Sequence, residues 1–154
     1  MKITIISVGK KHDDPIKNAI ATFETRLKKW VNIEWQIVPP SHLSGQQARD
    51  KEPEKMLKLL HAKDKSIIWL LDEIGQQLST IQLADSLQTF INYSTNIIFV
   101  IGGAYGVNSK VRTRADLVWS ISRLTLPHQL VRLILIEQLY RAMDINRGGR
   151  YHHA

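Results

Sequence analysis

The residues best suited to chemistry gather near the C-terminal end of the sequence. Arg147, Arg150, Tyr151, His152 and His153 follow one another within a short polar segment. Arginine binds phosphates, a tyrosine ring can stack on a base, and an imidazole exchanges protons near neutral pH. A disordered basic tail would have the same composition, so both interpretations remain open. Two adjacent histidines without further spaced ligands do not predict a metal site, and we expect no bound metal.

A glycine-rich segment, Gly102-Gly-Ala-Tyr-Gly106, directly follows an apolar run. Glycines in such a position let backbone amides approach a ligand, because no Cβ stands in the way. The pattern is neither the phosphate-binding loop, which carries a lysine, nor the dinucleotide fingerprint, which follows the first strand. A tight turn without a ligand would explain the same glycines. The segment is therefore one of several places where a ligand could bind.

Two further segments end apolar runs in the same way. One is the region after Leu71, which reads Asp72-Glu-Ile-Gly75, and the other is Ser122-Arg-Leu-Thr-Leu-Pro127. In open parallel sheets ligands gather at the carboxyl ends of the strands. We therefore expect these two segments and the glycine-rich one to lie around a common site. His128, which comes next in the chain, is interpreted as an N-terminal helix residue rather than a catalyst.

Strand-like and helical patterns alternate through the chain and set the expected fold. Short apolar runs rich in Ile and Val predict strands over 2–8, 32–38, 66–71, 96–101 and 117–121. Helical spacing of apolar residues predicts helices over 14–30, 54–62, 81–93, 109–115 and 128–145. This alternation predicts an α/β fold with a mainly parallel sheet of five or six strands. We expect one domain over residues 1–154.

Local signals refine the ends of these elements. Asp14 followed by Pro15 predicts an N-cap and a first-turn proline, and Pro53 should likewise lie in a first turn. Ser79 or Thr80 can cap the helix that follows. The polar residues 41–52 read as a flexible connection and are the expected mobile loop of the chain.

The helix predicted over 128–145 carries apolar side chains in every direction around its axis. Such a helix should be covered on several sides, by its own sheet and most simply by a second copy of the chain. A membrane span is the competing interpretation. Arg132, Glu137 and Arg141 oppose it, because each would cost about 2.5 to 3.5 kcal/mol at the centre of a bilayer. Glu137 and Arg141 are four residues apart and can form an ion pair on one face.

Composition narrows the class of function. The chain has 154 residues, no cysteine and a formal net charge of +7. Residues 102–154 hold 8 Lys and Arg against 3 acidic residues, so 8 − 3 = +5 of that charge lies in the last third. Concentrated positive charge favours nucleic acid as a partner, then an acidic membrane surface, although a basic surface without such a partner is the simpler alternative. The missing cysteines and the short apolar start favour a cytoplasmic protein without a signal peptide.

An ordered set of segments resembles the ribosomal RNA large subunit methyltransferase H family, of the SPOUT class. The resemblance begins with Met1-Lys-Ile-Thr-Ile-Ile-Ser-Val-Gly-Lys10 and runs end to end. It continues through these segments: Ile101-Gly-Gly-Ala-Tyr-Gly106, Ser120-Ile-Ser-Arg-Leu-Thr-Leu-Pro-His128, Arg132, Glu137-Gln-Leu-Tyr-Arg-Ala142 and Tyr151-His152. Arg150 and His153 depart mildly from the family pattern, which affects only the details of RNA contact.

The resemblance implies a fold, a cofactor and a homodimer. Family members have an α/β fold whose C-terminal helix threads through a loop to form a deep trefoil knot. They bind S-adenosyl-L-methionine in the knot and release S-adenosyl-L-homocysteine. Carried over by motif, the cofactor-binding residues are Leu71, Gly103, Ser122, Arg123, Leu124, Thr125, Leu126 and Pro127. Composite sites are common in this class, so the tail of one subunit is expected to complete the pocket of the other.

The reaction that the resemblance implies is methylation of N3 of a pseudouridine in 23S ribosomal RNA, on the assembled 70S ribosome. N3 is an imide nitrogen that must lose its proton, so a base is useful. His152 is the expected base, with Arg141 stabilising the developing anion and Tyr151 stacking on or orienting the ring. Two alternatives remain: a SPOUT methyltransferase that acts on another RNA such as transfer RNA, and a noncatalytic ribosome-binding factor.

Overall fold

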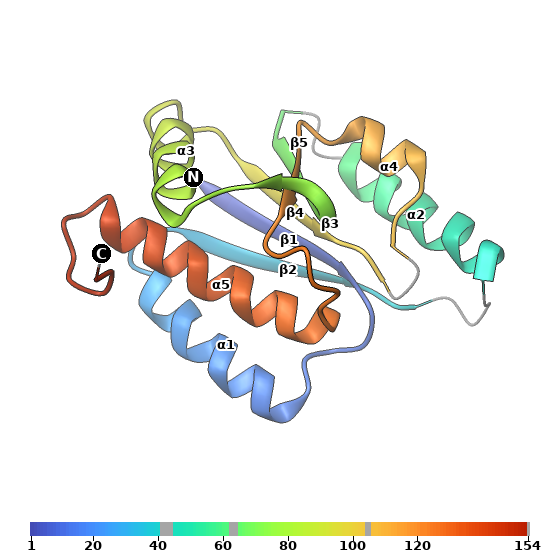
Figure 1. Ribbon diagram of the computed structural model, residues 1–154, viewed down its shortest axis with the longest axis horizontal. Coiled ribbons are helices and arrows are strands. Elements are labelled where there is room, and N and C mark those ends of the chain that lie inside the picture. Colours follow the sequence, from blue (N-terminus) through green and yellow to red (C-terminus); the bar gives the residue numbers. More distant parts are fainter. Residues whose placement is uncertain (41–44, 62–64, 104–105, 154) are drawn as a thin grey trace.

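Short apolar runs form a five-stranded sheet in the structure, a computed structural model that describes residues 1–40, 45–61, 65–103 and 106–153. The strands are β1 (Lys2–Val8), β2 (Asn32–Val38), β3 (Ile67–Gln77), β4 (Ile97–Ile101) and β5 (Leu117–Ser120). They lie in the order β2-β1-β4-β3-β5, and each neighbouring pair is parallel (Figure 1). The predicted α/β class with a parallel sheet is therefore confirmed.

Helices cover both faces of this sheet. The helices α1 (Asp14–Leu27), α3 (Thr80–Asn92) and α5 (His128–Ile145) lie on one face, and α2 (Gly45–His61) and α4 (Ser109–Arg114) on the other (Figure 1). Side chains on the two faces of the sheet pack into two separate hydrophobic cores. On β1, Ile3 and Ile5 pack toward the first set of helices, and Ile6 and Val8 pack toward the second. Burial on both faces explains why β4 is wholly apolar and why β1 and the first half of β3 are mostly apolar.

The helix starts agree with the predictions at α3, α4 and α5 but not at α1 and α2. Ser79 caps α3: its Oγ accepts from the Gln82 N–H at 3.2 Å, and Gln82 Oε1 accepts from the Ser79 N–H at 2.8 Å. At α1 the predicted N-cap is wrong, because Asp13 takes that position and Asp14 lies in the first turn. Pro15 fits there because a first-turn residue needs no N–H donor. The helix ends at Leu27, three residues before the predicted end.

The prediction of a flexible connection over 41–52 is wrong for residues 45–52, which form the first half of α2. Gln, Ala and Arg are good helix formers, so this polar segment needs no apolar periodicity to be helical. Pro53 lies inside the helix rather than in its first turn. The helix tolerates it because Met56 and Leu60 are fully buried in the core that follows. Residues 41–44 lie outside the described part of the chain.

Strand β3 is longer than predicted. The sequence predicted its end at Leu71, but the strand continues through Asp72 to Gln77 with a shift in register against Trp119 of β5. Gly75 makes the continuation possible, because a Cβ at this position would lie 2.6 Å from the carbonyl oxygen of Val118. The chain therefore bends closely past β5, and this extension forms one wall of the site described below.

Helix α5 lies between α1 and α3 and crosses the sheet (Figure 1). Its side chains Leu135, Ile136, Leu139 and Met143 are buried against the sheet and the flanking helices. Its other large apolar side chains stay partly accessible, and Leu130 is 37% exposed. The expectation that this helix is covered on several sides is met within one chain for its inner and flanking faces. Coverage of the outer face by a second copy remains a prediction.

Candidate functional site

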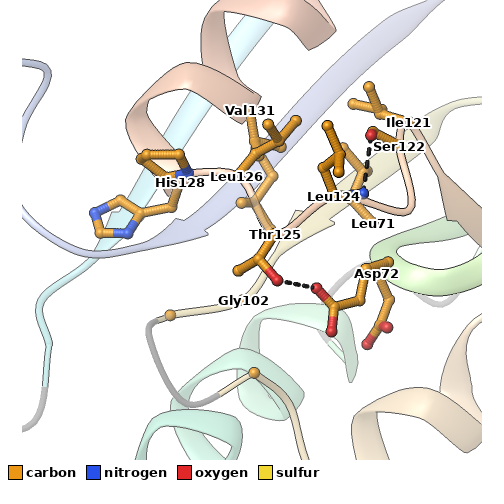
Figure 2. A pocket seen from close by; sticks show the side chains of 15 residues that line it. Leu71, Asp72, Gly102, Ile121, Ser122, Leu124, Thr125, Leu126, His128 and Val131 are labelled. Carbon is orange, nitrogen blue, oxygen red and sulfur yellow. Dashed lines mark hydrogen bonds between the residues drawn. The ribbon is translucent and has the colours of Figure 1, made fainter.

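A cavity of about 660 Å³ opens at the carboxyl ends of β3 and β4, against the segment that joins β5 to α5 (Figure 2). This volume lies within the range of pockets that hold cofactors and drug-sized ligands. The three segments picked out in the sequence meet here. The lining residues are Leu71, Asp72, Glu73, Ile101, Gly102, Gly103, Gly106, Ile121, Ser122, Leu124, Thr125, Leu126, Pro127, His128 and Val131.

The segment 121–127 forms one wall and has an irregular backbone held by its own serines. The Ser120 hydroxyl donates to the Ser122 carbonyl at 2.9 Å. The Ser122 hydroxyl accepts from the Leu124 N–H at 3.0 Å (Figure 2). Such local bonds compete with strand pairing and end β5. Pro127 then starts α5. Backbone groups and apolar side chains thus face the cavity together, and Leu124 is 73% exposed.

The glycines of the second wall have two different roles. The Gly106 N–H donates to the Gly103 carbonyl at 3.0 Å, and Gly106 has φ +73°, a conformation that favours glycine. Gly103 is required by packing instead: a Cβ there would lie 2.8 Å from Glu52 Oε2 and 2.9 Å from Val8 Cγ1. Gly106 fits the turn interpretation, whereas the close approach at Gly103 is to the protein itself, and the approach of a ligand to these glycines stays a prediction.

The charges on the cavity wall are carboxylates. Among the described residues that line it, Asp72 and Glu73 are the only acids, and neither lysine nor arginine is present. Asp72 pairs with Arg112 of α4 at 2.6 Å and also accepts from the Ile74 N–H at 3.1 Å. Glu73 accepts a hydrogen bond from the Thr125 hydroxyl at 2.8 Å, which joins the two walls. The cavity is therefore suited to a ligand that carries positive charge.

Beside the cavity, a fully buried arginine ties α5 to the end of β1. Arg132 donates to the Lys10 carbonyl at 2.9 Å and the Val8 carbonyl at 3.2 Å, and it lies 3.4 Å from His12 Nδ1. Burial lowers the pKa of both His12 and His128, and the nearby Arg132 charge lowers each further. Both imidazoles are therefore neutral at pH 7, and His128 adds no charge to the cavity wall.

Most of the cofactor residues implied by the resemblance surround this cavity. Those that line it are Leu71, Gly103, Ser122, Leu124, Thr125, Leu126 and Pro127. Arg123 does not line it and is exposed. The sequence interpretation missed His128 and Val131, which face the cavity from the first turn of α5. Their spacing of three residues, just after Pro127, was the available signal.

The three expected catalytic residues lie together at the other end of α5. Arg141 donates to Glu137 at 2.7 and 3.0 Å, and its guanidinium lies 4.5 Å from the centre of the Tyr151 ring. The Tyr151 N–H donates to Asp144 at 2.9 Å, so the tail folds back over the helix end. Burial and the Glu137 carboxylate raise the pKa of Tyr151, whose hydroxyl donates to Glu137 at 3.2 Å. Tyr151 therefore stays protonated and acts as a donor.

Within one chain these residues are far from the cavity. His128 and Arg141 are 13 positions apart on one helix, and at 1.5 Å per residue this places them about 20 Å apart. His152 lies beyond the helix end, and its Nδ1 is buried without a hydrogen-bond partner among the described residues. A single chain therefore does not bring the expected base to the cavity.

Metal binding and membrane insertion are two further possibilities for the described part of the chain. No group of three or more potential metal ligands occurs there. None of the helices described is both long and apolar enough to cross a bilayer. The cavity and the group of residues at the end of α5 are therefore the candidate sites for ligand binding and catalysis in the described part of the chain.

Comparison with known proteins adds a family. The family described as "Predicted SPOUT methyltransferase" matches residues 1–152. A protein of Methylobacillus flagellatus named Ribosomal RNA large subunit methyltransferase H is 36% identical over 153 residues, 99% of each chain. One of the same name from Psychrobacter arcticus is 38% identical over 159 residues, covering 99% of this chain and 98% of that protein.

Solved structures share the fold. A probable methylase family protein from Haemophilus influenzae matches with a TM-score of 0.62 at 14% identity, over 99% of this chain and 70% of that one. A probable methyltransferase from Bordetella pertussis matches with a TM-score of 0.58 at 11% identity, over 92% of this chain and 95% of that one. At such identities the likeness concerns the fold alone.

Proposed function

The chain belongs to the SPOUT methyltransferase family, and on that premise we propose that it methylates ribosomal RNA of the large subunit with S-adenosyl-L-methionine as methyl donor. The observation that carries the proposal is the cavity, which gathers seven of the eight residues implied as cofactor contacts. The relatives named Ribosomal RNA large subunit methyltransferase H match over nearly the full length of both chains and support the choice of substrate class.

The residues of the cavity fit this cofactor. Leu71 and Leu124 can cover the faces of an adenine ring, and the irregular backbone of 121–127 can hydrogen-bond its edge. The carboxylates of Asp72 and Glu73 suit the positive charge of a sulfonium. When bound, S-adenosyl-L-methionine supplies a methyl group on a positively charged sulfur and leaves as S-adenosyl-L-homocysteine.

The proposed acceptor is N3 of a pseudouridine in 23S ribosomal RNA. This nitrogen must lose a proton to become nucleophilic, and His152 is our proposed base because its Nδ1 has no partner among the described residues. Arg141 still has guanidinium N–H groups that Glu137 does not use, and these can stabilise the anion that forms on the base. Tyr151, which stays protonated, can stack on the ring or donate to it.

The separation along α5 leads us to propose a homodimer with composite sites. The cavity and His152 can act on one RNA base only if they come from different chains, because α5 holds them far apart within one chain. The partly accessible outer face of α5, including Leu130, is the surface that a second copy would cover. In a twofold dimer both cavities would be completed in the same way.

Four broader features belong to the same proposal. We propose that residues 1–154 form one catalytic domain, in agreement with the family match over 1–152. We propose the deep trefoil knot, supported by the way segment 121–127 runs beside the β3 extension before α5 returns across the sheet. A protein that modifies ribosomes would work in the cytoplasm. Its net charge of +7 supports binding to the RNA of an assembled 70S ribosome.

The test is transfer of labelled methyl from S-adenosyl-L-methionine to ribosomes that lack the modification. Free large subunits and naked 23S RNA are assayed beside whole ribosomes. Label in 23S RNA from whole ribosomes alone is the expected result. Label only in transfer RNA added to the assay would contradict the proposed substrate, and absence of cofactor binding would contradict the proposed enzyme.

A further inference from the structure

Two adjacent acids on the cavity wall differ in how their charges are compensated. Asp72 forms an ion pair with Arg112 at 2.6 Å, and this guanidinium neutralises its charge. Glu73 has only the neutral Thr125 hydroxyl as its hydrogen-bond partner among the described residues, at 2.8 Å. Within the described part of the chain, the wall therefore carries one carboxylate charge that no contacting cation balances.

The other charged groups near the cavity do not cancel this charge. His128 is neutral at pH 7, because burial and Arg132 lower its pKa. Arg132 is itself fully buried, and its N–H groups donate to the Ser7 hydroxyl and to the carbonyls of Val8 and Lys10, at and just after the end of β1. Arg123 is exposed and does not line the cavity. The negative charge of Glu73 is therefore not balanced by any of these groups.

We propose that Glu73 is a specificity-determining residue that makes the cavity prefer S-adenosyl-L-methionine over S-adenosyl-L-homocysteine. This inference rests on the proposed function. The two molecules share the adenosine, the ammonium and the carboxylate, and they differ in the sulfonium charge that the product has lost with its methyl group. A negatively charged wall attracts the sulfonium of S-adenosyl-L-methionine but does not attract the neutral sulfur of S-adenosyl-L-homocysteine. Glu73 therefore favours donor binding and product release.

A purely structural role for Glu73 makes a different prediction. The hydrogen bond from Thr125 joins segment 121–127 to the β3 extension, so its loss would deform the cavity for both ligands alike. Two substitutions separate charge from geometry. Glu73→Gln keeps an oxygen that accepts from Thr125 but removes the charge, whereas Thr125→Val removes the hydrogen bond and keeps the charge.

The experiment measures the dissociation constants of both ligands by calorimetry on the full-length protein. Glu73→Gln is expected to lower the preference for S-adenosyl-L-methionine about two- to fivefold, the range of an accessible charge pair. Thr125→Val should raise the dissociation constants of both ligands by the same factor and leave the preference unchanged. Glu54→Gln is the matched control, since Glu54 is an exposed acid on α2 that does not line the cavity.

A second variant shifts the preference in the opposite direction. Arg112→Met removes the partner of Asp72 and adds a second uncompensated charge to the wall, so the preference should rise. An unchanged preference in Glu73→Gln, with both ligands still bound, would overturn the inference and leave the proposed function standing. If the unmodified protein bound neither ligand, the proposed function itself would be wrong.

Discussion

Arg132 of α5 donates to the Oγ of Ser7 on β1 at 2.9 Å, and this joins residues 125 positions apart in the chain. The same guanidinium holds the carbonyls of Val8 and Lys10. It is fully buried, and no carboxylate hydrogen-bonds to it among the described residues. The contact fixes the start of α5, and hence Pro127, His128 and one wall of the cavity, to the end of β1.

Arg132→Met should therefore destabilise the protein strongly. The methionine fills much of the space but offers no donor to the Ser7 hydroxyl or to the carbonyls of Val8 and Lys10, which lie in buried or partly buried positions. We expect the free energy of unfolding in urea to fall by about 3 kcal/mol, measured at one fixed protein concentration. Lys17→Met, at an exposed position on α1, is the control and should change it by less than about 0.5 kcal/mol. Equal stability of the two variants would show that Arg132 is not a structural tie.

Stability should also fall as the solution becomes acidic. The pKa values of His12 and His128 are lowered in the folded state, by burial first and by Arg132 second, so the unfolded chain binds protons more readily. Asp13 opposes the shift only at His128. The free energy of unfolding should therefore keep its highest value above about pH 6.5 and decrease as the pH falls below about 6.5, because the histidines then gain protons more readily in the unfolded chain.

Replacing both histidines by asparagine should flatten this dependence between pH 7 and pH 5. The measurement is the urea midpoint at a series of pH values. His153→Asn is the control, because His153 is exposed at the tail. A slope that is the same in the double variant and in the control would mean that other groups cause the acid sensitivity.

The bend of β3 gives a steric prediction. A Cβ on Gly75 would lie 2.6 Å from the Val118 carbonyl, so Gly75→Ala must push β3 and β5 apart. We expect a loss of about 1 to 3 kcal/mol in thermal or urea unfolding, together with weaker cofactor binding. Gly148→Ala is a useful comparison, because Gly148 has φ +67° but open space around it. It should lose only about 1 kcal/mol, from backbone strain, and keep cofactor affinity.

The sequence predicted the elements that a continuous apolar pattern defines. Five apolar runs gave the five strands, and the capping signal at Ser79 or Thr80 gave the start of α3. The extension of β3 beyond Leu71 could not be predicted, since its residues are polar and their place depends on the bend at Gly75. The start of α2 was missed for a similar reason, because its first residues carry helix propensity without apolar spacing.

The site was predicted in position but not in its electrostatics. Strand ends and the resemblance located the cavity, because both depend on local segments of the chain. The pairing of Asp72 with Arg112 joins residues 40 positions apart, and no local pattern signals it. The burial of Arg132 is equally non-local. Whether His152 meets a cavity depends on a second chain, which a single sequence does not describe.

The proposed base makes a kinetic prediction. His152→Ala should slow single-turnover methylation of whole ribosomes about 10²- to 10⁴-fold at pH 7, because the N3 proton would lose its acceptor. The neighbouring His153→Ala should leave the rate within about twofold, since that side chain is exposed. A rate for His152→Ala that equals the unmodified rate across neutral pH would remove His152 from the mechanism.

The most direct test of the account asks whether two chains share one site. Leu124→Arg damages the cavity at an exposed position, and His152→Ala damages the tail. Each variant alone should be inactive. Unfolded together in equal amounts and refolded, they should recover about a quarter of the unmodified single-turnover rate, because half of the dimers then hold one intact composite site. No recovery, with heterodimers present by mass, would contradict the account and place cavity and base within a single chain.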